Sequence, residues 1–209
     1  MSSQQFSNTS TGDAPADPYK DANKDEAPLD QKVTDFVNFA TGVKFGMMTT
    51  RNASSGDLVS RAMAIAGTET GGVDLLFHTN TESHKTDEIS SDSHTNIAFY
   101  NSSGEWASVS GESSVITDRD LVKKTYSPAL KAWLGDLGDG KHDGSENDPR
   151  IGVIRVKAKS ITYAINNRTA IGRIAQVAEG VVTGSPAQVN KLREISPSEV
   201  QQWRSSNSS

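Results

Sequence analysis

The first clear pattern of apolar and polar positions predicts a helix. Val33, Phe36, Val37 and Ala40 recur at steps of three and four residues, which places them on one face of a helix over residues 30–41. Such a face must pack against other elements. We therefore expect this helix to cover part of a core.

Beyond this helix the apolar positions recur at strand-like spacing. Polar turns rich in Gly, Asn and Ser separate short apolar segments at distances typical of hairpins. The last of these segments, residues 151–165, alternates apolar and polar positions as a long half-buried strand does. The expected strands are residues 43–50, 58–66, 73–79, 94–100, 106–117 and 151–165.

Helical patterns interrupt the strands without regular strand–helix alternation. This order favours an α+β fold with an antiparallel barrel over a doubly wound parallel sheet. The expected helices cover residues 82–91, a segment capped by Asp118, and residues 127–133, 171–182 and 196–203.

The ends of the chain differ in composition from its centre. Residues 1–28 contain few apolar side chains, so they cannot bury enough surface to offset the entropy of ordering, and we expect a disordered N-terminal tail. Residues 29–184 form the predicted barrel domain. Residues 185–209 form a C-terminal extension whose short helix opens with a capping box at Ser196.

Composition excludes several classes of function. The chain of 209 residues has a formal net charge of −5 and no cluster of Lys and Arg, so we expect no nucleic-acid partner. It has no cysteine, which excludes disulfides and thiolate chemistry. No apolar stretch is long enough to span a membrane and no signal peptide is visible, so the predicted location is cytoplasmic, without a membrane partner.

Two sequence motifs carry little weight. Residues 135–141 match the phosphate-loop pattern G-x-x-x-x-G-K, but His142 replaces the Ser or Thr that would bind magnesium, and we interpret the segment as a surface loop. The histidines show no helical pair or ligand cluster, so no metal site is predicted.

A possible anion site emerges from residues that are distant in sequence. Arg61 lies inside an apolar strand, and a later strand ends just before Ser83 and Lys85 open a helix. A helix N-terminus offers free N–H groups and a positive dipole end, so the three side chains could hold a dianion. An outward-facing arginine and an ordinary helix cap are the alternatives.

These segments, in this order, resemble the flavin-contacting blocks of the pyridoxamine 5′-phosphate oxidase-like split-barrel proteins. The blocks are Arg61, residues 77–85 and residues 106–112. Within this FMN-binding family the chain is most similar to bacterial general stress proteins and fungal blue-light-inducible proteins. The resemblance implies a six-stranded split barrel of Greek-key type that forms a homodimer with FMN at the interface.

The same resemblance assigns roles to individual residues. It implies that Arg61, Ser83 and Lys85 hold the phosphate with help from His84, and that Trp133 reaches the flavin across the dimer or else anchors a core or interface. The other implied contacts, which would line or meet the flavin ring, are Ala62, Met63, His78, Thr79, Asn80, Trp106 and Ser108. No catalytic acid or base is assigned.

Two departures from the oxidase pattern bear on activity. Ala66 stands where the oxidases carry a second basic residue, and the chain ends without their arginine-containing substrate segment, so pyridoxamine-phosphate oxidation itself is not expected. The leading hypothesis is an FMN-dependent oxidoreductase that accepts electrons from NAD(P)H or a small reduced substrate. FAD is the alternative cofactor; a non-enzymatic flavin-binding stress or light-response protein and a cofactor-free scaffold are the alternative functions.

Overall fold

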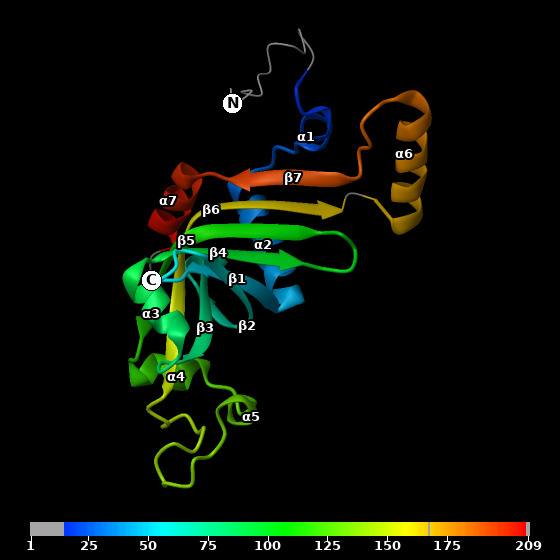
Figure 1. Cartoon of the computed structure of the whole chain (residues 1–209). Coiled ribbons are helices and arrows are strands. Elements are labelled where there is room, and N and C mark those ends of the chain that lie inside the picture. Colours follow the sequence, from blue (N-terminus) through cyan, green and yellow to red (C-terminus); the bar gives the residue numbers. More distant parts are fainter. Residues whose placement is uncertain (1–14, 167, 208–209) are drawn as a thin grey trace, which may run out of the picture.

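A computed structural model describes residues 15–166 and 168–207 of the chain. Its centre is a closed antiparallel barrel, in which the strand order β3-β2-β1-β4-β5-β6 is completed by pairing between β3 and β6 (Figure 1). The neighbours β4-β1-β2-β3 form a Greek key. The barrel strands are β1 (Phe45–Arg51), β2 (Leu58–Glu69), β3 (Asp74–Asn80), β4 (His94–Tyr100), β5 (Trp106–Ile116) and β6 (Ile151–Asn166).

Helices surround the barrel, which confirms the α+β prediction (Figure 1). Each barrel strand and each predicted helix lies within a few residues of its expected position. The helices are α1 (Pro18–Asn23), α2 (Leu29–Val43), α3 (His84–Ser91), α4 (Arg119–Thr125), α5 (Leu130–Leu134), α6 (Ala170–Thr183) and α7 (Pro197–Ser206).

The barrel interior explains why the strands alternate. In β4, Ile97 and Phe99 are buried in the core, whereas Ala98 and Tyr100 are exposed. Helix α2 covers the core with Phe36, which packs near Tyr163 of β6. The apolar face predicted for this helix is therefore the face that the core buries.

One further strand, β7 (Asn190–Ile195), pairs with β6 outside the closed barrel and was not predicted. Its inward positions are Arg193 and Ile195, and the Arg193 guanidinium pairs with Asp25 and Asp35. A buried arginine interrupts the alternation of apolar and polar residues that identified the other strands. The extension from residue 185 thus contributes to the sheet as well as carrying α7.

Within the tail predicted to be disordered, residues 18–23 form α1, and contacts with the β7 segment hold residues 19–25; residues 1–14 lie outside the described residues. Asn23 is buried and accepts hydrogen bonds from the backbone N–H groups of Val189 and Asn190, at 2.9 Å each. Lys24 forms a parallel bridge with Leu192. These contacts use backbone groups and one amide side chain, so the low apolar content did not reveal them.

Candidate functional site

The barrel has a seam between β2 and β3. These strands pair only over Ile65–Glu69 and Asp74–Phe77, with a bulge at Ala66. Before the bulge β2 pairs with β1, and the end of β3 pairs with β6. Residues 61–63 and 78–80, two of the predicted cofactor-binding segments, therefore lie on the strands that diverge at this seam.

Helix α3 begins directly after β3, at the seam. Ser83 is its N-cap residue but makes no side-chain capping bond; its hydroxyl donates to the carbonyl oxygen of Asn80 (2.7 Å). The Lys85 ammonium donates to the Ser83 hydroxyl oxygen (2.8 Å). The start of α3 thus combines a cation, a hydroxyl and the positive end of a helix dipole.

Arg61 reaches the same place from β2. Its guanidinium donates to the Thr50 hydroxyl oxygen and to the Glu88 carboxylate, both at 2.6 Å, and Glu88 lies on α3. Burial lowers the pKa of Lys85, and the neighbouring positive charge of Arg61 lowers it further, against the opposing effect of Glu88. The structure therefore brings Arg61, Ser83 and Lys85 together.

Glu88 is a site residue that the sequence analysis missed. It is buried, and it accepts hydrogen bonds from Thr50 (2.6 Å) and Arg61. Burial acts to raise its pKa, but these two bonds and the nearby charges of Arg61 and His84 together outweigh burial, so the pKa of Glu88 is lowered and the carboxylate stays ionised. A glutamate in a polar helical segment has the sequence signature of an exposed residue, so nothing local marked this one.

The seam offers an anion two cationic side chains, with carboxylates close by. Arg61 and Lys85 contribute two positive charges, and Glu88 offsets one of them; the exposed Asp87 adds a second carboxylate in the first turn of α3. His84 is exposed on the first turn and close enough for its charge to lower the pKa of Glu88. A dianionic phosphate would find charge-assisted donors here.

The remaining predicted contacts at the seam differ in orientation. Ala62 is exposed, whereas Met63 packs against the core. The buried Thr79 hydroxyl donates to the carbonyl oxygen of Asn80 (3.1 Å). His78 makes a 3.1 Å contact through Nε2 with the Thr125 hydroxyl on α4, and burial lowers its pKa. That contact gives His78 an anchoring role between β3 and α4.

Three predicted contacts lie on other elements, β5 and α5. Trp106 and Ser108 lie on β5, which is three strands from β2 in either direction around the barrel. Ser108 accepts a hydrogen bond from Asn96 (2.8 Å). Trp133 is 84% exposed on α5, at the end of the molecule that carries the loop of residues 135–150 (Figure 1).

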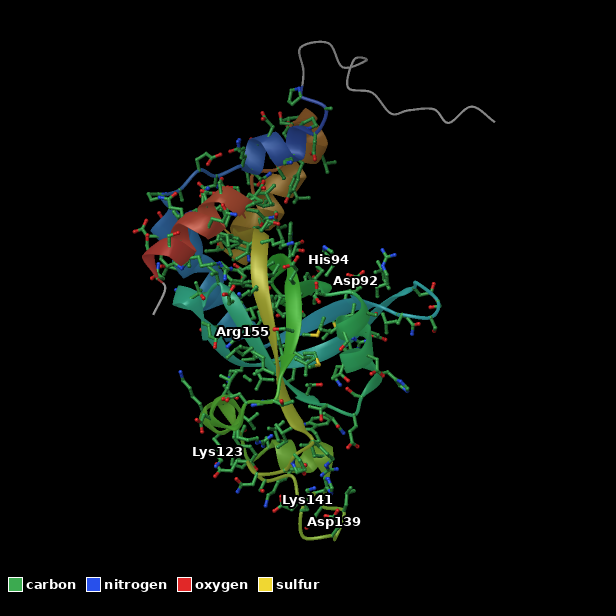
Figure 2. The ribbon with its side chains drawn as sticks, turned by 90° about the vertical axis from the view of Figure 1, so that its left-hand side faces the viewer. Asp92, His94, Lys123, Asp139, Lys141 and Arg155 are labelled. Carbon is green, nitrogen blue, oxygen red and sulfur yellow. The ribbon has the colours of Figure 1, made fainter. Side chains whose placement is uncertain are left out.

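A separate hollow of about 400 Å³ lies over β1, β4 and β5, and its lining includes none of the predicted contacts. Its lining includes Thr50, the hydroxyl partner of Arg61, as well as Asp92 and His94. Figure 2 shows Asp92 and His94 side by side, and their side chains are 2.7 Å apart. The hollow is therefore adjacent to the seam cluster through Thr50.

The phosphate-loop motif forms an exposed loop, as predicted. Figure 2 shows Asp139 and Lys141 at the far end of the molecule. Asp139 accepts hydrogen bonds from the backbone N–H groups of Lys141 and His142, so the loop is closed by its own acidic side chain. Within the described ranges, no group of three or more His, Cys, Asp or Glu side chains is placed to bind a metal ion.

Comparison with known proteins decides the family. A family model described as pyridoxamine 5′-phosphate oxidase like matches residues 31–188. The chain belongs to this family. The match contains the whole closed barrel and the seam cluster, so the resemblance inferred from the sequence is confirmed at this level.

Relatives of the oxidase-like chain agree with this assignment. This chain is 64% identical over 208 residues to Protein bli-3 of Neurospora crassa, and the match covers 99% of this chain and all of that protein. General stress protein 26 of Bacillus anthracis str. Sterne shares its fold with a TM-score of 0.52, at 20% identity, over 65% of this chain and 92% of that one. A Clostridium acetobutylicum protein related to general stress protein 26 has a TM-score of 0.53 at 15% identity, over 66% and 89%.

In this oxidase-like chain, no helix among the described residues is both long and apolar enough to cross a membrane.

Proposed function

We propose that this protein binds FMN, with the phosphate at the seam and the flavin between two copies of the chain. The observation that carries the proposal is the convergence of Arg61, Lys85 and the Ser83 hydroxyl at the start of α3. When bound, the flavin supplies the redox chemistry, and the protein positions it. FAD is the alternative, because the seam recognises a phosphate and both cofactors carry one.

The position of the other predicted contacts supports a homodimer. Trp106 and Ser108 lie three strands from β2, and Trp133 is exposed. A second copy can present these side chains to the flavin ring, which lies beyond the phosphate. The assembly is therefore part of the proposed site.

We further propose an oxidoreductase that takes electrons from NAD(P)H or a small reduced substrate in the cytoplasm. Pyridoxamine-phosphate oxidation is not part of this proposal. The arginine near the C-terminus, Arg204, is ion-paired with the buried Asp74 (2.7 Å), and Trp203 donates to the carbonyl oxygen of Thr70 (3.1 Å). Both side chains hold α7 against the barrel, so they are engaged in structure.

The test is the purified protein itself. We expect a yellow protein with flavin absorption bands, FMN in the extract after denaturation, and multiple turnovers of NAD(P)H with an added acceptor. Flavin without turnover would favour the alternative, a non-enzymatic flavin-binding protein. A colourless protein that fails to bind added FMN or FAD would contradict the proposal.

The pH dependence of FMN binding provides a second prediction. The pKa of Lys85 is lowered by burial and by Arg61, so its ammonium loses a proton at a lower pH than an ordinary lysine. FMN affinity should therefore fall as pH rises through this lowered pKa, because the neutral amine attracts phosphate weakly. The stability of the flavin-free protein changes in the opposite direction. Burying the charged ammonium lowers the free energy of unfolding, and this penalty decreases as pH rises from the lowered pKa towards 10.5.

Fluorescence titration of the flavin from about neutral to about pH 10 measures the effect. The matched control is Lys85→Arg, since a guanidinium stays charged over this range. The control should show a nearly flat profile. Equal pH profiles in the two proteins would show that Lys85 does not contact the phosphate.

A further inference from the structure

Helix α6 is amphipathic, but its apolar side faces away from its own chain. Five of its large aliphatic side chains are exposed to between 52% and 85%. Figure 1 shows the helix standing apart from the barrel, beyond the ends of β6 and β7. An apolar helix face of this kind normally packs on a core or a partner. The exposed side chains are Ile171, Ile174, Val177, Val181 and Val182.

The polar side of α6 determines this orientation. Arg173 donates to Asn166 (2.6 Å) and to the carbonyl oxygen of Ser103 at the tip of the β4–β5 hairpin. A Cβ atom at Gly180 would lie 2.6 Å from the carbonyl oxygen of Ser185, so this glycine permits the returning chain to lie against the helix. The polar side is therefore attached to the molecule, and the apolar side is presented outward.

The outer face of the barrel carries a second uncovered apolar surface. Phe45, Met47 and Tyr100 are 61%, 44% and 69% exposed on the neighbouring strands β1 and β4. Met47 lies between Ala98 and Ala62, and Tyr100 pairs with Trp106, so these cross-strand neighbours are also uncharged. We call these three residues the barrel patch. Tyr100 directly precedes the hairpin that Arg173 contacts.

Other occupants of the α6 face fit less well than a second copy. Residues 1–14 contain only Met1 and Phe6 as large apolar side chains, too few to cover five aliphatic residues. A helix that lies on a lipid surface usually carries several Lys or Arg on its polar side. The polar side of α6 has one, Arg173, and it is bonded within the chain.

The exposed area agrees with a stable dimer. Burying one aliphatic side chain removes roughly 60–120 Å² of apolar surface at about 25 cal/mol per Å². Five side chains of α6 and three of the barrel patch then amount to roughly 800 Å² per chain, which is the size of a standard interface on each partner. In a two-fold dimer each chain would contribute both surfaces.

We propose that α6 is a dimerisation arm that packs on the barrel patch of a second copy of this chain. The proposal specifies the contact within the homodimer proposed above, and it requires no bound flavin.

Introducing charge on the arm tests the proposal by sedimentation velocity. The double variant Ile174→Glu/Val181→Glu should shift the protein from dimer to monomer, because the introduced carboxylates would be buried at the interface. Gln201→Glu/Gln202→Glu on α7 adds the same charge at exposed positions and should stay dimeric. Circular dichroism should show that all three proteins are folded. A monomeric native protein, or a dimer that survives the arm variant, would overturn the proposal.

Cross-linking identifies the surface that the arm contacts, because the chain has no cysteine of its own. Val181→Cys protein mixed with Met47→Cys protein should give a mixed dimer with a bismaleimide, whereas Gln201→Cys in place of Val181→Cys should not. Cross-links between two Val181→Cys chains alone would replace the proposed contact with helix–helix packing. Sedimentation of the native protein with phosphatidylcholine–phosphatidylserine vesicles, abolished by the arm variant, would assign α6 to lipid instead.

The experiments can contradict the dimerisation arm and the proposed flavin binding independently. A native dimer without flavin, monomerised by the arm variant, would leave the arm intact as an inference while the proposed cofactor fails. A flavin-containing protein that stays dimeric in the arm variant would contradict the arm inference and support the proposed cofactor.

Discussion

Replacing Arg61 and Lys85 with alanine should remove most of the bound flavin and leave a folded dimer. Each side chain offers charge-assisted hydrogen bonds to a phosphate, worth about 1.5–3 kcal/mol each. Losing both should therefore weaken flavin binding by roughly 100-fold or more, at about 1.4 kcal/mol per factor of ten. The ratio of flavin to protein after purification, followed by titration with FMN, measures the loss.

Glu88 determines how this experiment is designed. The Glu88 carboxylate is buried and bonded to Arg61, so truncating the arginine alone leaves a buried charge without its partner and destabilises the fold. The triple variant Arg61→Ala/Lys85→Ala/Glu88→Gln removes this complication. Glu88→Gln alone is its control, and it should retain flavin because both cations remain.

A second control tests the effect of charge alone. Lys123→Ala/Lys124→Ala removes two positive charges from the exposed surface of α4 and should retain flavin. Equal flavin content in the triple variant and the native protein would contradict the phosphate assignment, whatever their stability.

Replacing Asp148 with asparagine should lower the free energy of unfolding by about 3–5 kcal/mol. Asp148 is fully buried, and its carboxylate accepts from the Arg150 guanidinium at 2.6 Å and from the backbone N–H of Gly144 at 2.7 Å. The same guanidinium donates to the carbonyl oxygens of Leu134 and Gly135. The substitution leaves this buried guanidinium without a counter-charge.

Asp148 should also confer acid sensitivity. The Arg150 guanidinium is the main cause that lowers the pKa of Asp148 from 3.8 to about 2, against the effect of burial. A carboxyl group whose pKa is lower in the folded state stabilises the fold above its unfolded pKa. This contribution, roughly 2 kcal/mol, is lost as pH falls from about 4 to about 2. The asparagine variant should lack it.

Chemical denaturation at several pH values measures both effects. Asp136→Asn in the same loop is the matched control, because Asp136 is exposed and should change stability by no more than about 0.5 kcal/mol. An Asp148→Asn protein as stable as the native one would show that the pair does not hold the loop. The effect should reach the seam, since the backbone N–H of Thr81 donates to the carbonyl oxygen of Arg150 (2.8 Å).

Local patterns predicted the barrel because each strand alternates at its own positions. Residues 151–165 were recognised as a strand from their alternation, and β6 spans Ile151–Asn166. Strand β7 escaped recognition because Arg193 occupies an inward position, where its partners Asp25 and Asp35 come from residues more than 150 positions away. The anchoring of residues 19–25 was missed because its partners also lie more than 150 positions away.

In the candidate site, too, the sequence indicated some residues and only the structure revealed others. Arg61, Ser83 and Lys85 were recognisable because their types and positions resemble a family, and the structure brings them together. Glu88 was not recognisable, because its burial depends on Arg61 and Thr50 from two other elements. Likewise, the sequence predicted α6 as an amphipathic helix, but only the structure showed that its apolar face points outward.

The sequence by itself predicted the six barrel strands, the helices α2 to α7 and the family, and it singled out three residues of the proposed phosphate site. Each of these depends on periodicity within one element or on residue types in a fixed order. Only the tertiary structure decided that β2 and β3 diverge at a seam, that Glu88 neutralises part of its charge, and that Trp106 and Ser108 lie three strands from β2. The reason is physical: a side chain's burial and charge environment are set by neighbours that are distant in the chain, and no local pattern records them.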